Sequence, residues 1–152
     1  ARKHSVTQTH WQPETDALPA LAALRQAGYR IGLISNASDA ADVQLLIDKG
    51  GFREFLDAIV ISADFGERKP APRIFEHALR EINAVAAETV MIGDSLAADV
   101  AGAHNLGMRA IWISRRVDTP ENHRLAVELQ PDGIIITLGE LPPLLERWNA
   151  AA

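Results

Sequence analysis

The sequence has no cysteine, few aromatic residues and no long apolar segment. Without cysteine the chain can form neither disulfides nor a thiolate zinc site, and this favours a cytoplasmic protein. No stretch approaches the ~20 apolar residues of a membrane span, so no membrane partner is expected. The net charge of −5 gives no reason to expect nucleic acid as a partner either.

The composition is that of a globular chain rather than a disordered one. Apolar residues make up 47% of the sequence and charged residues 23%, which is enough apolar material for a folded core. The length of 152 residues predicts one compact domain. The polar residues before Trp11 carry the weakest structural signal.

Short apolar segments alternate with helical periodicity along the rest of the chain. Nearly continuous runs of Ile, Val and Leu predict strands buried on both faces, at Tyr29–Ser35, Ala58–Ser62, Thr89–Gly93, Arg109–Ser114 and Asp132–Thr137. Helices are predicted at Leu18–Ala27, from a cap at Ser38 or Asp39 to Lys49, at Pro72–Ile82, at Leu96–Leu106, from Thr119 onward, and at Leu141–Trp148. This alternation predicts a doubly wound, mostly parallel α/β sheet.

Ligands of doubly wound sheets bind at the carboxyl ends of the strands, and the first candidate there is Ser35. The segment Leu33–Ser38 reads LISNAS, a strand that stops at a hydroxyl and runs into a helix start. The Ser35 hydroxyl can donate to a phosphate oxygen, and free N–H groups of the following helix would add to the attraction. In the competing interpretation, Ser35 and Asn36 are ordinary turn residues and Ser38 is a helix cap.

The second candidate is Lys69, within the segment Glu67–Pro72 that reads ERKPAP. Neighbouring prolines make this lysine stiffer than an ordinary surface lysine. Its point charge suits a phosphoryl group or a nearby carboxylate. The competing interpretation is a solvated lysine beside the start of a helix.

The third candidate is the acidic segment Val90–Asp99, which reads VMIGDSLAAD. Asp94 follows a strand and a glycine, and magnesium prefers such hard oxygen ligands, commonly one or two carboxylates. Asp94 is therefore predicted as a direct Mg²⁺ ligand. Asp99 is better placed to bind a coordinated water or the lysine. A helix cap is the competing interpretation of Asp94, although Ser95 could fill that role.

In this order and spacing, the three segments resemble the second, third and fourth motifs of the haloacid dehalogenase superfamily. The resemblance covers nearly all of residues 13–140. It implies that Ser35, Asn36 and Lys69 bind the phosphoryl group, with Ser35 and Lys69 taking part in catalysis. It also implies that Asp94 holds magnesium with support from Asp99. Paired acids after a glycine resemble the metal-dependent phosphatases more than the metal-free dehalogenases.

The nucleophile motif of this family has no counterpart in the sequence. In the family, an aspartate at the end of the central first strand attacks phosphorus, and another two residues later acts as acid and base. Asp16 follows helix-entry sequence and Asp64 leads into Phe65, so neither replaces the nucleophile. We therefore expect the central first strand and the cap domain to be absent, with residues 1–12 a remnant of the cap or a linker and residues 13–152 an incomplete core.

A sheet without its central strand would have two buried edges with unpaired backbone groups. We expect a missing N-terminal segment, closure of the edges on each other, or a second copy in a homo-oligomer to complete it. The histidines share no ligand spacing and are expected to be structural or solvated; they are His4, His10, His77, His104 and His123.

The expected activity is magnesium-dependent hydrolysis of a small phosphate monoester through an aspartyl-phosphate in the complete protein, with this chain alone inactive. Two alternatives stay open. One is a non-catalytic binding or assembly module with the same fold. The other is a dehalogenase or phosphomutase of the same superfamily.

Overall fold

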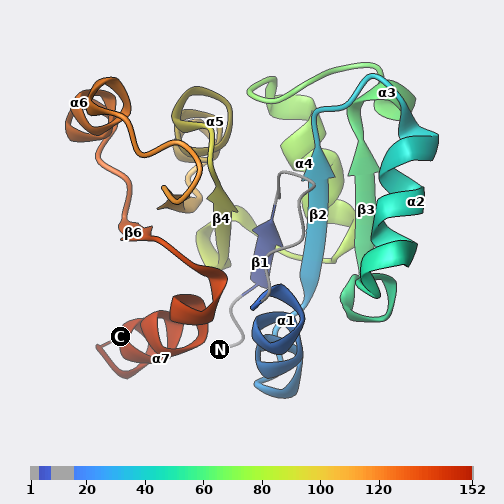
Figure 1. Ribbon diagram of the computed structural model, residues 1–152, viewed down its shortest axis with the longest axis horizontal. Coiled ribbons are helices and arrows are strands. Elements are labelled where there is room, and N and C mark those ends of the chain that lie inside the picture. Colours follow the sequence, from blue (N-terminus) through green and yellow to red (C-terminus); the bar gives the residue numbers. More distant parts are fainter. Residues whose placement is uncertain (1–3, 8–15, 152) are drawn as a thin grey trace.

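The computed structural model describes residues 4–7, as strand backbone, and residues 16–151. Its described strands form one parallel sheet in the order β3-β2-β1-β4-β5-β6 (Figure 1). They are β1 (His4–Thr7), β2 (Ile31–Ser35), β3 (Ala58–Ile61), β4 (Thr89–Gly93), β5 (Arg109–Ile113) and β6 (Gly133–Ile135). All five predicted strands are confirmed, and their ends agree within two residues. The doubly wound fold is confirmed with them.

The central position of the sheet is occupied by β1 from this same chain. It pairs in parallel with β2 on one side and with β4 on the other. The expectation that the central strand is absent was therefore wrong, and neither an added segment, edge closure nor a second copy is needed to complete the sheet. The sequence His-Ser-Val-Thr is short and has Val6 as its one apolar residue, so its pattern does not indicate a buried strand. The rest of the segment assigned to a cap remnant or linker lies outside the described residues.

The predicted helices are also present. The described α-helices are α1 (Ala17–Gln26), α2 (Ala40–Gly50), α3 (Ser62–Phe65), α4 (Pro72–Glu81), α5 (Ala101–Asn105), α6 (Pro120–Leu129) and α7 (Leu141–Ala151). The helix predicted from Leu96 is divided, because a π-helical turn, η3 (Leu96–Val100), precedes α5. Short 3₁₀ turns, η1 (Arg53–Phe55), η2 (Ala86–Glu88) and η4 (Leu138–Glu140), complete the connections.

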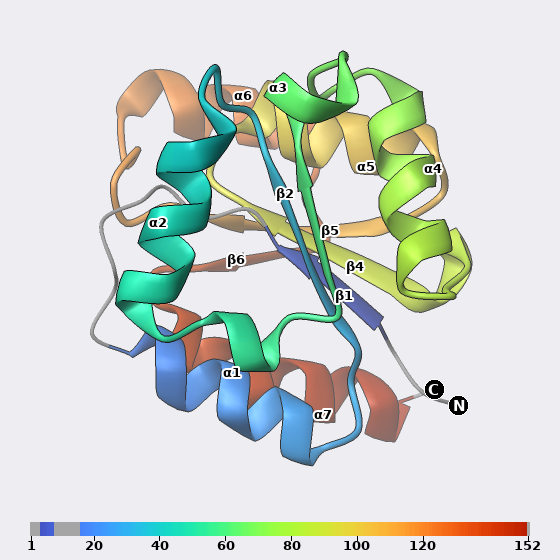
Figure 2. The same ribbon diagram turned by 90° about the vertical axis from the view of Figure 1, so that its right-hand side faces the viewer.

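Helices cover both faces of the sheet (Figure 2). Alternate residues of the inner strands belong to the cores on opposite faces. Met91 and Trp112 belong to the core under α4, α5 and α6. Ile111 on the other face packs with α1 and α7. Leu33 packs with α2 on that same face. Helices on both faces explain why these strands read as continuous apolar runs.

The strand order places the carboxyl ends of β2 and β4 on either side of β1. From β1 the chain proceeds to β2 and β3 in one direction, and from β4 to β5 and β6 in the other. The order thus reverses between β1 and β4, and this switch point is where open α/β sheets bind ligands. In the described part of the chain, no helix has the length and apolar character needed to cross a membrane.

Candidate active site

Asn36, directly after β2, holds the main chain of Lys69. Its Oδ1 accepts from Lys69 N at 2.8 Å, and its Nδ2 donates to Lys69 O at 3.0 Å. These two bonds attach the loop before α4 to the end of β2. The neighbouring Ser35 is the last residue of β2 and is 1% exposed. The observed partner of Asn36 is thus Lys69, and its contact with a phosphoryl group stays a prediction.

N–H groups around the start of α2 are bonded to protein atoms. The Asp39 carboxylate accepts from Ala41 N at 2.9 Å and from Asp42 N at 3.4 Å. The Ser62 hydroxyl accepts from Ala37 N and donates to Ala37 O, both at 2.9 Å. The expectation that this helix start offers free N–H groups to a phosphate is wrong for Ala41 N and Asp42 N, because the Asp39 cap already binds them.

The Lys69 side chain is buried and bridges the two sides of the switch point. Its Nζ donates to Ile34 O at 3.1 Å, at the end of β2, and to Asp99 Oδ1 at 2.7 Å, beyond β4. Burial lowers the pKa of Lys69 to about 8, against the charge and hydrogen bond of Asp99 and the charge of Asp94, which raise it. The interpretation of Lys69 as a solvated surface lysine is therefore wrong.

Asp94 and Asp99 have different surroundings. Asp94 directly follows β4 and is 8% exposed, whereas Asp99 lies in η3 and is fully buried. The Asp99 carboxylate accepts from Lys69 through Oδ1 and from Ser95 N through Oδ2, the latter at 3.1 Å. Both of its oxygens have protein partners, so Asp99 contacts the lysine, one of the two partners expected for it. Ser95 caps η3 by accepting from Ala98 N, so Asp94 is not the cap.

The π-helical turn and Gly93 make room for Asp99 beside the strand end. Asp99 N donates to Ser95 O at 2.8 Å, and Val100 N approaches the same oxygen at 3.4 Å. A Cβ atom at Gly93 would lie 2.0 Å from Asp99 Oδ2, so a larger residue would displace the carboxylate. Single π turns within helices occur frequently at functional sites.

The residues fit a magnesium site in part. Asp94 offers a hard carboxylate oxygen at the carboxyl edge, and magnesium commonly takes only one or two carboxylates beside water and phosphate oxygens. Among the side chains of residues 16–151, no three from His, Cys, Asp or Glu gather to hold a metal ion. A magnesium ion bound here would therefore need Asp94, water, phosphate oxygens and a ligand other than a described His, Cys, Asp or Glu side chain.

Two side chains of the site were not predicted. Trp112 of β5 donates from Nε1 to Asp94 O at 3.0 Å. Ser62 fixes the loop after β2 through its two hydrogen bonds to the main chain of Ala37. Ser62 directly follows the apolar strand β3, much as Ser35 ends β2, so its position was a usable signal. Trp112 lies inside a continuous apolar run, where an aromatic residue indicates core packing and nothing more.

Three histidine side chains in residues 16–151 each lie beside a carboxylate. The pairs are His77 with Glu81, His104 with Asp132, and His123 with Asp118.

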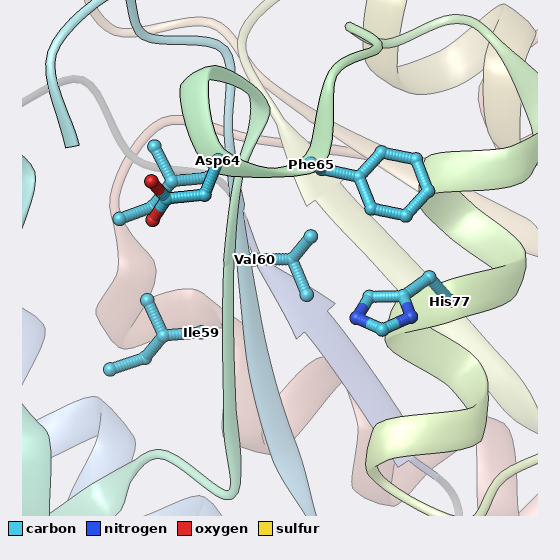
Figure 3. Close-up of a pocket in the computed structure, with 6 residues that line it drawn as sticks. Ile59, Val60, Asp64, Phe65 and His77 are labelled. Atoms are coloured by element: carbon cyan, nitrogen blue, oxygen red, sulfur yellow. The ribbon is translucent and has the colours of Figure 1, made fainter.

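A hollow of about 320 Å³ lies against β3, an edge strand of the sheet, as Figure 3 shows. Its lining residues are Ile59, Val60, Ile61, Asp64, Phe65 and His77, and none of them belongs to the site above.

Fold and site together define an α/β protein with a lysine–aspartate cluster at the switch point of a Rossmann-like sheet. The family model of haloacid dehalogenase-like hydrolases matches residues 4–107, and the chain belongs to this family.

Three similar proteins illustrate the range of the family. Ribulose-1,5-bisphosphate 5-phosphatase of Halopiger xanaduensis is 34% identical, over 86% of this chain and 55% of its own length. A 2-haloacid dehalogenase structure from Pseudomonas syringae has a TM-score of 0.74 at 31% identity, over 90% of this chain and 54% of that one. A Bacillus subtilis HAD hydrolase solved with bound magnesium has a TM-score of 0.75 at 25% identity, over 89% and 57%. The chain thus spans about half the length of the curated relatives it matches.

Proposed function

We propose that the complete protein is a magnesium-dependent phosphatase that hydrolyses a small phosphate monoester through an aspartyl-phosphate, and that this chain alone is inactive. The observation that carries the proposal is the buried ammonium of Lys69, held between the end of β2 and Asp99 and close enough to Asp94 to be influenced by its charge. A buried cation with two carboxylates nearby suits a dianionic phosphoryl group and a bound metal ion better than it suits a neutral substrate.

Each side chain has a distinct role in the proposal. Ser35 donates its hydroxyl to a phosphoryl oxygen, and Lys69 neutralises the charge that builds up on the phosphoryl group. Asp99 keeps the ammonium in place, and Asp94 would hold the magnesium ion. Bound magnesium would polarise the phosphoryl oxygens and offset their negative charge.

The attacking carboxylate must come from another residue. β1 ends at Thr7, and the sequence continues Gln8-Thr9-His10 without an acid. In the proposed reaction an aspartate oxygen bonds to phosphorus while the ester oxygen leaves and takes a proton from an acid. Water then attacks phosphorus, the bond to the aspartate breaks, and inorganic phosphate is released. Such an aspartate would have to come from another part of the complete protein and reach the carboxyl edge of the sheet, beside Lys69 and Asp94.

The test is hydrolysis of p-nitrophenyl phosphate by the complete protein. We expect activity with Mg²⁺, loss with EDTA and recovery on adding Mg²⁺. Asp94→Asn should abolish the activity, whereas Glu128→Gln, an exposed carboxylate on α6, should leave it unchanged. This chain alone should release no phosphate. A complete protein that is inactive with every divalent metal tested would contradict the proposal.

The sequence of β1 also supports the alternative of a non-catalytic binding module. The central strand of the described sheet ends without a carboxylate, so the site as it stands can bind but cannot form an aspartyl-phosphate. Equilibrium dialysis with radiolabelled phosphate separates the two functions. Saturable binding without turnover in the complete protein would favour the binding module.

A further inference from the structure

We infer that Trp112 positions Asp94 for metal binding, an inference that rests on the proposed function. The indole Nε1–H donates to the main-chain oxygen of Asp94 at 3.0 Å, and the Trp112 side chain is fully buried. Trp112 pairs with Gly93 in the ladder between β4 and β5, one residue before Asp94. The hydrogen bond therefore extends the link between these two strands to the first peptide beyond the end of β4.

The peptide group between Asp94 and Ser95 is held from both sides. Its oxygen accepts from Trp112, and its N–H, which belongs to Ser95, donates to Asp99 Oδ2 at 3.1 Å. In a planar trans peptide the C=O and N–H point in opposite directions, roughly perpendicular to the line between the two Cα atoms, so these two bonds together oppose rotation of the peptide about that line. The direction of the Asp94 Cα–Cβ bond follows from the backbone on both sides of that residue. Trp112 and Asp99 therefore help to set the direction in which the Asp94 side chain leaves the backbone.

The indole ring is itself well anchored. It lies in the core formed with α4, α5 and α6. The rings of Trp112 and His123 pack edge to face, with centroids 5.2 Å apart and an interplanar angle of 75°. His123, on α6, contacts the carboxylate of Asp118. Because the Trp112 ring is held in place, its N–H cannot follow the Asp94–Ser95 peptide if that peptide rotates. The hydrogen bond therefore favours one orientation of the peptide.

Plain core packing makes a different prediction. Phenylalanine would fill most of the same space and needs no hydrogen-bond acceptor, whereas a buried indole N–H requires one. The acceptor used here is the carbonyl of the predicted metal ligand. If Trp112 served packing alone, removing the N–H would change stability and leave metal affinity unaltered.

The experiment is isothermal titration of the metal-free complete protein with MgCl₂. We expect Trp112→Phe to raise the Mg²⁺ dissociation constant roughly tenfold, as losses of partners that orient metal ligands usually do. Trp148→Phe is the matched control. Trp148 packs with the core on the opposite face of the sheet, and the guanidinium carbon of Arg109 lies 4.4 Å from its ring centroid. Replacing Trp148 should leave Mg²⁺ affinity unchanged. Asp94→Asn should abolish binding.

A sulfur isostere keeps the test independent of folding defects. Benzothienylalanine at position 112 retains the shape of the indole and lacks the N–H, so it should weaken Mg²⁺ binding as Trp112→Phe does. Wild-type affinity in both variants would overturn the inference and leave the proposed function intact. A wild-type complete protein that binds no Mg²⁺ would contradict the proposed function and the inference together.

Discussion

Lys69 Nζ and Asp99 Oδ1 lie 2.7 Å apart, and the two side chains are 0% and 1% exposed. The pair links the loop before α4 to η3, across the point where the strand order reverses. Removing two charges from water costs free energy that their attraction often fails to repay. Such a pair is therefore better explained by the chemistry of the site than by a contribution to stability.

The buried pair predicts a strong interaction between two substitutions. Lys69→Met or Asp99→Leu alone should destabilise the fold by about 3–5 kcal/mol, because each leaves one charge buried without its partner. The double variant should lose much less than the sum, since no unpaired charge remains. Urea unfolding of the four proteins measures the coupling. Additive losses would show that the two charges do not depend on each other.

The lowered pKa of Lys69 predicts a rise in stability with pH. The folded pKa is about 8 and the ordinary value is 10.5, so between these values the unfolded chain holds a proton that the folded chain has lost. The contribution of Lys69 to the unfolding free energy should therefore increase from pH 8 to 10.5, by about 1.4 kcal/mol for each unit of pKa difference. Below pH 8 the cost of burying the ammonium is fully present.

The Lys69→Met variant isolates this contribution from other groups that titrate at alkaline pH. Urea unfolding of both proteins at pH 7, 8, 9 and 10 gives the difference in unfolding free energy. We expect that difference to shift in favour of the wild type above pH 8. A difference that stays constant over the range would mean that burial does not lower the pKa of this lysine.

Gly93→Ala should damage the site more than Gly32→Ala. The new Cβ at position 93 would lie 2.0 Å from Asp99 Oδ2 and 2.3 Å from its Cγ, while at position 32 the nearest atom, Ile82 Cγ2, is 3.4 Å away. Overpacking of this kind costs about 1–3 kcal/mol. Thermal unfolding measures the loss, and Mg²⁺ affinity should fall only in Gly93→Ala. Equal effects of the two changes would argue against the close approach of Asp99.

Asn36→Ala should loosen Lys69 and weaken phosphate binding. The substitution removes both hydrogen bonds to the Lys69 main chain, whereas Asn36→Asp keeps the acceptor for Lys69 N and loses the donor. Phosphate affinity, measured by equilibrium dialysis of the complete protein, should fall severalfold in Asn36→Ala and by less in Asn36→Asp. If Asn36 bound only the phosphoryl group, Asn36→Asp would lower phosphate affinity more than Asn36→Ala, because it adds a negative charge.

The sequence predicted the fold and most of the candidate site, because the signals involved are local. Apolar runs in Thr89–Gly93 and its neighbours mark buried strands, and Ser35 and Asp94 stand where those strands end. Parallel strands bring their carboxyl ends to one edge, so residues at those ends can be grouped before any contact is known. The missed strand β1 shows the limit, since four residues of mixed polarity carry no such signal.

The sequence by itself determined the strands, the helices and the order of Ser35, Lys69 and Asp94 along the chain, since these depend on neighbouring residues and on periodicity. Only the tertiary structure decided that His4–Thr7 fills the centre of the sheet, that Asn36 binds a main chain 33 residues away, and that Trp112 binds the carbonyl of Asp94 18 residues away. Hydrogen bonds between distant segments depend on the packing of the whole sheet, and no local pattern records them.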